Sequence, residues 1–465
     1  MQKTLLIKSA VTAGLALVLA VPLGMVDQLV GERAARQRAV VNEIASSSAG
    51  AQTLTGPVLV LPYTEEYTES YWADEPVEGG TKRVRRTRQC KVEGKTLIMP
   101  RAVEMDFHGG TALKRRGLFK ALVYELDGAI QGEFAIPAEP EVERHREGSH
   151  LTWGQPYLSV GLSDTRGIAR APLLQWGDAE QGFEQGAGLG QTLSNGLHAK
   201  LPALIQTQTS AGTPDAPRIV PFTLKLGFRG TESVSFVPLA QSTRVALSST
   251  WPHPSFQGRF LPNTDSQRQD ADGFSAVWEV SGLATTAPAA LRADVAAGRA
   301  CSSGCAEWLG VRFIEPVNVY SMADRALKYG ILFIALSFAA FFLFELVKSL
   351  RIHPAQYLLV GLALALFFLL LLSLSEHIAF GQAYAVATAA CVGLQGFYLS
   401  TVLGSARRGI GFAALLGALF AALYGLLVSE DVALLMGSLL LFGLLALTMV
   451  LTRHLDWYAI EVKRG

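Results

Sequence analysis

Residues 356–375 read QYLLVGLALALFFLLLLSLS, a run of twenty positions without a charged side chain. A helix of about 20 apolar residues is long enough to cross the hydrocarbon core of a bilayer. The run is apolar on every side and shows no polar stripe at helical spacing, which argues against a helix of a soluble bundle. Glu376 and His377 close it. This stretch predicts a transmembrane helix and therefore a membrane protein.

Five other apolar runs lie at the two ends of the chain, where charged residues separate them. They are Ser9–Val26, Tyr329–Phe344, Ile378–Leu403, Gly409–Val428 and Val432–Leu451. We therefore expect six transmembrane helices. The first run also resembles a secretory signal peptide, with Lys3 and Lys8 before it and a cleavage site after Ala20. Because the run continues to Val26 and further spans follow, we favour a retained anchor.

The composition fits a chain with unequal parts. Half of its 465 residues are hydrophobic and 17% are charged, whereas about 25% is usual for soluble domains. The 40 Lys and Arg residues nearly balance the 39 Asp and Glu residues, and a net charge of +1 argues against a nucleic-acid partner. Four cysteines are too few for a disulfide scaffold. Most charges lie in residues 27–328, which have the charge density of a soluble domain.

Basic residues in short loops set the orientation of a membrane protein. If the N-terminus is cytoplasmic, nine Lys and Arg residues fall inside: Lys3, Lys8, Lys348, Arg351, Arg407, Arg408, Arg453, Lys463 and Arg464. The two short outer loops contain none. Arg33, Arg36 and Arg38, just outside the first span, are a complication. The pattern predicts cytoplasmic N- and C-termini and puts residues 27–328 in the periplasm or exterior.

The exported middle of the chain is predicted to be rich in β-strands. Short apolar or alternating runs indicate strands at 57–62, 121–126, 157–162, 222–228, 233–238, 243–248 and 274–280. Clusters of Gly, Pro, Asn and Asp separate these runs. Many short strands without long helices between them favour a sandwich-like, mainly antiparallel domain. The predicted fold class is thus an α+β membrane protein, and the strand order is not readable from one sequence.

The predicted organisation has four parts. They are an N-terminal transmembrane anchor (1–26), a juxtamembrane helix (27–50), a periplasmic β-rich domain (51–325) and a five-helix transmembrane domain with a short cytoplasmic tail (326–465). Apolar and charged residues are interleaved in the juxtamembrane helix, which fits a solvated stalk. The alternative is a helix that lies on lipid headgroups through its arginines.

Three polar residues of the exported domain are candidate functional residues. Asp164 and Arg166 lie in an Asp-Thr-Arg-Gly segment after a predicted strand, although an aspartate at a turn usually bonds its own backbone. His253 lies between two prolines in Trp-Pro-His-Pro, a rigid extended segment. Binding is one interpretation and a structural role is the other. Because the sequence has no HExxH, Gly-x-Ser-x-Gly or phosphate-loop motif, we predict no catalytic residue, metal or cofactor.

Glu345, Glu376 and His377 are the informative ionisable residues of the membrane part. An ionisable group at bilayer depth is costly and suggests function. These three fall near the ends of predicted spans, so they can also reach the headgroup region. A proton or ion path would normally show such groups in mid-span, and the sequence therefore gives little support to a transporter or channel.

Cys301 and Cys305 form a Cys-x3-Cys pair. In an oxidising compartment such a pair can form a disulfide, provided that the geometry allows it. Two free thiols are the alternative, and a metal site would need further ligands that the neighbouring sequence lacks.

Several segments resemble the CreD family of inner-membrane proteins. In the exported domain they are SSSAGAQTLTGPVLVLP (46–62), VGLSDTRGI (160–168) and LSSTWPHPSFQGRFLP (247–262). In the membrane part they are DRALKYGILFIALSFAAFFLFEL (324–346), HPAQYLLVGLALALFFLLLLSLSEH (353–377) and DWYAI (456–460). The resemblance covers almost the whole chain in the same order.

This resemblance implies a role in cell-envelope integrity under control of a two-component system, and it implies no enzymatic activity or cofactor. We therefore expect a non-enzymatic inner-membrane protein, surrounded by membrane lipid, whose periplasmic domain binds an envelope component or a partner protein. Two alternatives remain, a transporter or lipid-handling protein and an exported cell-wall hydrolase. A polar cavity among the helices would favour the first. A histidine and a carboxylate within hydrogen-bond reach in a cleft would favour the second.

Overall fold

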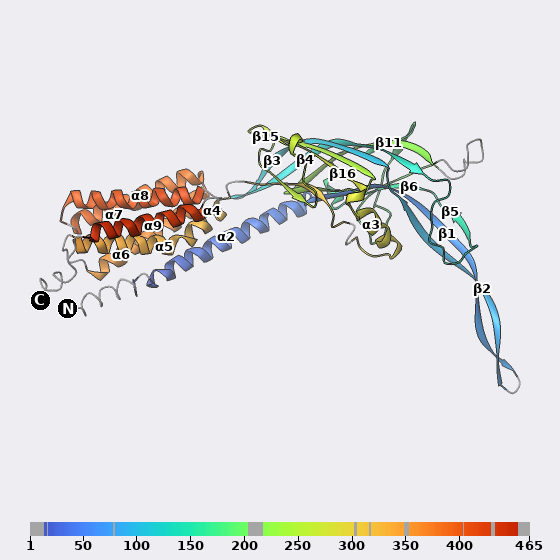
Figure 1. The fold of residues 1–465 in the computed structure, drawn as a ribbon, viewed down its shortest axis with the longest axis horizontal. Helices are drawn as coiled ribbons and strands as arrows, with labels where there is room; N and C mark the ends of the chain where they lie inside the picture. The colour runs from blue at the N-terminus through green and yellow to red at the C-terminus, as the bar shows by residue number, and fades with distance from the viewer. Residues whose placement is uncertain are drawn as a thin grey trace. The chain divides into compact units, whose positions relative to one another are not determined.

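The computed structural model describes residues 14–453 apart from 16, 78–79, 203–216, 302–304, 316–317, 348–352, 403 and 429–432. The chain forms two compact units, residues 1–39 with 316–465 and residues 40–315. Helix α2 (Ala20–Ser47) runs without a break through this boundary (Figure 1). The helix includes most of residues 27–50, the predicted juxtamembrane segment. The predicted anchor is described only from residue 14 onward.

The unit of residues 40–315 is built on two sheets. Among the described residues, the nine-stranded first sheet contains β1 (Gln52–Val77), β2 (Gly80–Ile98), β5 (His150–Trp153), β6 (Tyr157–Leu162), β9 (Glu184–Gln185), β10 (Gly196–Lys200), β12 (Ser233–Val237), β14 (Pro254–Gly258) and β17 (Leu309–Phe313). The eight-stranded second sheet contains β3 (Ala102–Arg116), β4 (Phe119–Ile136), β7 (Leu173–Trp176), β8 (Ala179–Gly182), β11 (Arg218–Thr231), β13 (Ser242–Ser249), β15 (Arg268–Asp270) and β16 (Gly273–Ser281). A helix, α3 (Ala287–Ala296), lies between β16 and β17 in the chain.

The two sheets share one aromatic and aliphatic core. Phe107 of β3 contacts Phe228 of β11 with ring centroids 5.4 Å apart, and it contacts Phe236 of β12 in the other sheet at 5.6 Å. All three rings are at most 1% exposed. Burying such aromatic side chains is the main source of stability for a layered fold. The packing supports the predicted sandwich.

Both sheets are mixed, because each contains one parallel pair within the described part. Strand β1 runs parallel to β12, and β3 runs parallel to β13. The other strand pairings are antiparallel. Most of the described strand pairs are antiparallel, as predicted, and these two parallel pairs are the exceptions. The physical reason is the chain path, which returns to β12 and β13 only after long connections, and such connections allow parallel pairing.

Strands β1 and β2 form a long ribbon (Figure 1). Their register runs from the pair Leu59 and Ile98 to the pair Val77 and Gly80. Beyond Glu66, which still pairs with β5, the described part of β1 pairs with β2 alone.

The segments that enter and leave this unit both pair with β12. Gln52 pairs with Val234 on one side, and Arg312 pairs with Ser233 on the other. The two ends of the unit are thus held close together by its first sheet.

The other unit is helical. After α2 come α4 (Val319–Lys328), α5 (Gly330–Val347), α6 (Pro354–Ser375), α7 (Phe380–Val402), α8 (Ala406–Val428) and α9 (Ala433–Thr452). Helix α4 was not expected, because residues 319–325 were assigned to the β-rich domain. The predicted boundary at 325/326 falls inside this helix.

Three of the described helices, α6, α7 and α8, are long and apolar enough to cross a membrane. They coincide with the predicted runs 356–375, 378–403 and 409–428. Helices α5 and α9 correspond to the predicted runs 329–344 and 432–451. Judged by their described residues alone, these two helices are not among those long and apolar enough to cross a membrane. Residues 9–13 and 16 of the first run lie outside the described residues. The described helices alone therefore support three of the six predicted spans.

The helical unit has a packed aromatic interior. The ring of Phe420 on α8 lies 4.6 Å from that of Phe333 on α5 and 4.5 Å from that of Phe367 on α6. Gly361 on α6 lies against the N-terminal segment, since a Cβ there would meet Leu19 Cδ1 at 2.0 Å. The absence of a side chain at Gly361 lets Leu19 pack directly on α6.

Candidate functional site

The outer face of the second sheet is polar. Residues of β3 alternate between the core and solvent, as expected for a strand with one buried face. The buried residues are Val103, Met105 and Phe107, and the exposed ones are Glu104, Asp106 and His108. In antiparallel pairs, directly opposed residues share a face. The exposed residues of β3 therefore share the outer face with Gln131, Ala129 and Asp127 of β4, their respective partners.

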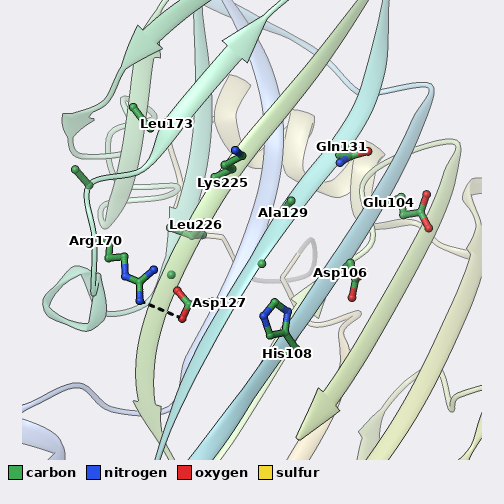
Figure 2. Close-up of a pocket in the computed structure, with 13 residues that line it drawn as sticks. Glu104, Asp106, His108, Asp127, Ala129, Gln131, Arg170, Leu173, Lys225 and Leu226 are labelled. Carbon is green, nitrogen blue, oxygen red and sulfur yellow. Dashed lines mark ion pairs between the residues drawn. The ribbon is translucent and has the colours of Figure 1, made fainter.

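This face is hollowed over β3, β4 and β11, and a cavity of about 670 Å³ lies there (Figure 2). Its floor is lined by small residues, including Ala129 and Gly227. A Cβ at Gly227 would meet Asp127 Oδ1 at 2.4 Å, so the glycine leaves room for this carboxylate. Arg170 forms a loose ion pair with Asp127, with Nη2 and Oδ2 3.8 Å apart. Small residues in the middle and charged ones around them form an open polar cavity.

Sequence reasoning missed this site. Polar residues at alternate positions of β3 were the available signal, but the facing residues of β4 and β11 become visible only with the strand register. The cavity holds groups of both charges, namely Glu104, Asp106 and Asp127 against Arg170 and Lys225, with His108 beside them. Such a set can bind a charged, polar ligand by ion pairs and hydrogen bonds.

Asp164 and Arg166 lie at the junction between α2 and β1. The Asp164 carboxylate accepts hydrogen bonds from the backbone N–H of Arg166 at 3.1 Å and of Gly50 at 3.2 Å. The Arg166 side chain donates to the same carboxylate at 2.9 and 2.6 Å. These side-chain bonds from Arg166 hold the pKa of the Asp164 carboxyl below its ordinary value, although partial burial opposes them. The turn role of Asp164 is therefore present in the structure.

The same junction is closed by a buried glutamine. Gln52, 1% exposed, donates to the carbonyl oxygens of Asp164 at 2.8 Å and Arg229 at 3.0 Å. Arg166 also donates to the carbonyl of Ser46 in the last turn of α2, where a positive charge is favourable. Two of the segments that carry the family resemblance, 46–62 and 160–168, thus meet here. Their contacts fasten the helix to the sheet domain.

His253 is exposed and stands beside β14. Its ring meets that of Trp251 edge to face, with centroids 6.2 Å apart. Its carbonyl accepts a hydrogen bond from the N–H of Ile314 at 3.0 Å, and Trp251 Nε1 donates to the carbonyl of Ile314 at 2.8 Å. The Trp-Pro-His-Pro segment therefore holds the chain where it leaves β17. His253 does not line the cavity on the second sheet.

Glu376 forms a polar contact at the C-terminal end of α6. Its Oε1 lies 3.7 Å from Arg33 Nη1 on α2 and accepts a hydrogen bond from Tyr320 Oη on α4 at 3.1 Å. The Glu376 side chain is 10% exposed. His377, the next residue, is exposed. Glu345 belongs to α5, but the surroundings of its side chain lie outside the described residues. Three elements of the helical unit are thus tied together at Glu376.

Cys301 and Cys305 are joined by a disulfide, with Sγ atoms 2.06 Å apart. Cys90 and Cys391 are free thiols. Among the described residues, no group of three or more His, Cys, Asp or Glu side chains is arranged to hold a metal ion.

A contact between Glu65 of β1 and His145 was also not predicted from the sequence. The buried Glu65 carboxylate contacts His145 Nδ1 at 2.8 Å and accepts backbone hydrogen bonds from His145 and Arg146. Burial raises the pKa of the carboxyl, but the hydrogen bonds from His145 and Arg146 oppose it, and the pKa is lowered to about 2. His145 lines a cavity of about 900 Å³ with Tyr63 and Lys95. The carboxylate fastens the segment around 145 to β1.

The fold is that of a membrane protein with long apolar helices and a large mixed-sheet domain. The sequence profile described as "Inner membrane protein CreD" matches residues 4–458. The chain is also 32% identical over 452 residues to the inner membrane protein CreD of Escherichia coli (strain K12), which covers 97% of this chain and 93% of that protein. The chain belongs to the CreD family of inner membrane proteins. This family is not a known family of enzymes.

Proposed function

We propose that the protein crosses the inner membrane six times, with both termini in the cytoplasm and the β-rich domain in the periplasm. Helices α5 and α9, of 18 and 20 residues, would join α6, α7 and α8 as spans, because Glu345 is their only charged residue. The packing of Leu19 against Gly361 supports a retained N-terminal anchor as the sixth. The nine basic residues of the predicted cytoplasmic segments support this orientation.

We further propose that the protein maintains envelope integrity without catalysis, and that its periplasmic domain binds an envelope component. The observation that carries this proposal is the open polar cavity on the outer face of the second sheet. A domain with such a cavity, whose two ends are held close together by β12, is suited to bind a component of the envelope and keep it near the membrane.

The experiment is photo-crosslinking in living cells. A photoreactive amino acid replaces Gln131, an exposed residue that lines the cavity, and in a control chain it replaces Leu283, which is fully exposed away from it. We expect a specific crosslinked product from position 131 alone, and mass spectrometry identifies the captured molecule. Equal products at both positions, or none at 131 in a correctly inserted chain, would contradict the proposal.

The transporter alternative receives less support, because the helical unit has an aromatic interior around Phe420. The hydrolase alternative has one observation in its favour, the Glu65–His145 contact beside a cavity. In the described part of the chain, however, His145 makes no hydrogen bond to a hydroxyl or thiol that could serve as nucleophile. If the purified protein hydrolysed cell-wall material and the His145→Gln variant did not, the hydrolase alternative would be favoured.

A further inference from the structure

The register of the second sheet aligns three residues in one row across the cavity. Asp106 of β3 is opposite Ala129 of β4, and Ala129 is opposite Lys225 of β11. All three lie on the outer face and line the cavity. Figure 2 shows Asp106 and Lys225 on opposite sides of Ala129. Adjacent strands are about 4.8 Å apart, so the backbones that carry the two charges are about 10 Å apart, with only a methyl group between them.

The neighbouring charges already have partners. Glu104 pairs with Arg244, which also lies 3.6 Å from Glu279. Asp127 pairs with Arg170. In contrast, neither Asp106 nor Lys225 makes an ion pair within the described part of the chain, and both are exposed. The row therefore offers one anionic and one cationic group that are both available to a ligand.

We propose that this row binds a zwitterionic group, in which a primary ammonium and an anionic phosphate lie a few bonds apart. The ammonium would contact the Asp106 carboxylate, the phosphate would contact Lys225, and the small side chain of Ala129 would leave room for the linking carbons. A ligand with a single charge satisfies only half of the row, so both charges are needed for full affinity. This inference rests on the proposed function, since it specifies the chemistry of the component that the domain binds.

Calorimetric titration of the full chain, purified in an uncharged detergent, tests the proposal with three probes. Phosphoethanolamine carries both charges, while ethanolamine and glycerol phosphate carry one each. We expect phosphoethanolamine to bind at least tenfold more tightly than either single-charge probe. Vesicles of phosphatidylethanolamine, compared with phosphatidylglycerol vesicles, show whether the group is recognised on a lipid. Equal binding of glycerol phosphate, or no binding of phosphoethanolamine in either form, would overturn the proposal.

Variants locate the site. Asp106→Asn, Lys225→Gln and Ala129→Leu should each weaken phosphoethanolamine binding at least tenfold, the last by filling the space between the charges. Lys114→Gln, on an exposed part of β3 away from the cavity, is the matched control and should change nothing. The double exchange Asp106→Lys with Lys225→Asp should recover binding that each single charge reversal abolishes. Unchanged binding in Asp106→Asn and Lys225→Gln would refute the assignment.

The outcomes separate this inference from the proposed function. If position 131 captures an envelope component in cells while no zwitterion binds the purified chain, the proposed function stands and this inference fails. If zwitterions bind at the row but nothing is captured in cells, the site is real and the envelope role is in doubt.

Discussion

Arg33 of α2 and Glu376 at the end of α6 form an ion pair, with Nη1 and Oε1 3.7 Å apart. The two residues come from opposite ends of the chain, so the pair fastens the N-terminal helix to the helices that follow the sheet domain. Arg33 lies just outside the first predicted span, where a basic residue does not fit the charge pattern. The ion pair gives this residue an acidic partner.

We expect Glu376→Gln to destabilise the full chain by about 1–2 kcal/mol, because the carboxylate is largely buried and loses the attraction of Arg33. Thermal unfolding in detergent measures this. A double-mutant cycle with Arg33→Gln should give a coupling energy of about 1 kcal/mol. Arg36→Gln, at an exposed position of the same helix, is the control. Strict additivity of Glu376→Gln and Arg33→Gln would show that the contact does not stabilise the protein.

Arg166→Gln should loosen the junction between α2 and β1, since it removes the bonds to Asp164 and to the carbonyl of Ser46. The free energy of unfolding should fall only modestly, because the Arg166 side chain is largely exposed to solvent. Hydrogen exchange should accelerate in residues 44–52, while Arg115→Gln at an exposed site leaves it unchanged. Unaltered exchange in that segment would mean that Arg166 has no fastening role.

Acid should release the Glu65 contact. The carboxyl has a pKa of about 2 in the folded chain against an ordinary value of 4.5, so the unfolded chain binds more protons between these values. The contribution of Glu65 is therefore complete above pH 4.5 and is lost as the pH falls toward 2. Glu65→Gln should unfold more easily at pH 7 and show a weaker loss of stability between pH 4.5 and 2. Glu66→Gln, at the exposed neighbour, is the control. An identical pH dependence in Glu65→Gln would contradict this role.

Mass spectrometry after alkylation can count the free thiols of the protein. Of four cysteines, two are paired, so alkylation of the unfolded, unreduced chain should modify Cys90 and Cys391 only. Reduction should raise the number to four. Replacing Cys301 and Cys305 by serine should cost about 2 kcal/mol or less, because the bridge closes a very short loop. Four modified cysteines before reduction would show that the pair is not oxidised.

The sequence allowed the apolar elements to be predicted. Strand β6 has the predicted bounds, and α6, α7 and α8 coincide with predicted runs, because burial imposes an apolar pattern on a helix or strand. The outer part of the β1–β2 ribbon was missed. Its residues 82–91 carry many charges, and residues 83–91 are exposed or half-buried, so they show no hydrophobic alternation.

The candidate site could not be predicted for a different reason. Asp106 and Lys225 are far apart in the chain and become neighbours of Ala129 only through strand register, which one sequence does not contain. Asp164 and Arg166 were named as candidates from the sequence. The hydrogen bond from the Arg166 backbone N–H to the Asp164 carboxylate is the turn contact that was the structural interpretation of Asp164. Glu65 escaped notice because a buried carboxylate on an otherwise charged strand resembles its exposed neighbours in the sequence.

Labelling of cysteines in intact cells shows on which side of the membrane each part of the protein lies. We propose that the sheet domain is periplasmic and that the loops rich in basic residues are cytoplasmic. Chains in which Cys90 is replaced by serine carry either Gln131→Cys in the sheet domain or Arg407→Cys in the first turn of α8, and a maleimide that cannot cross the inner membrane is added. We expect labelling at position 131 without cell lysis and labelling at position 407 only after the membrane is opened. Labelling at 407 in intact cells, with position 131 protected, would contradict this proposal.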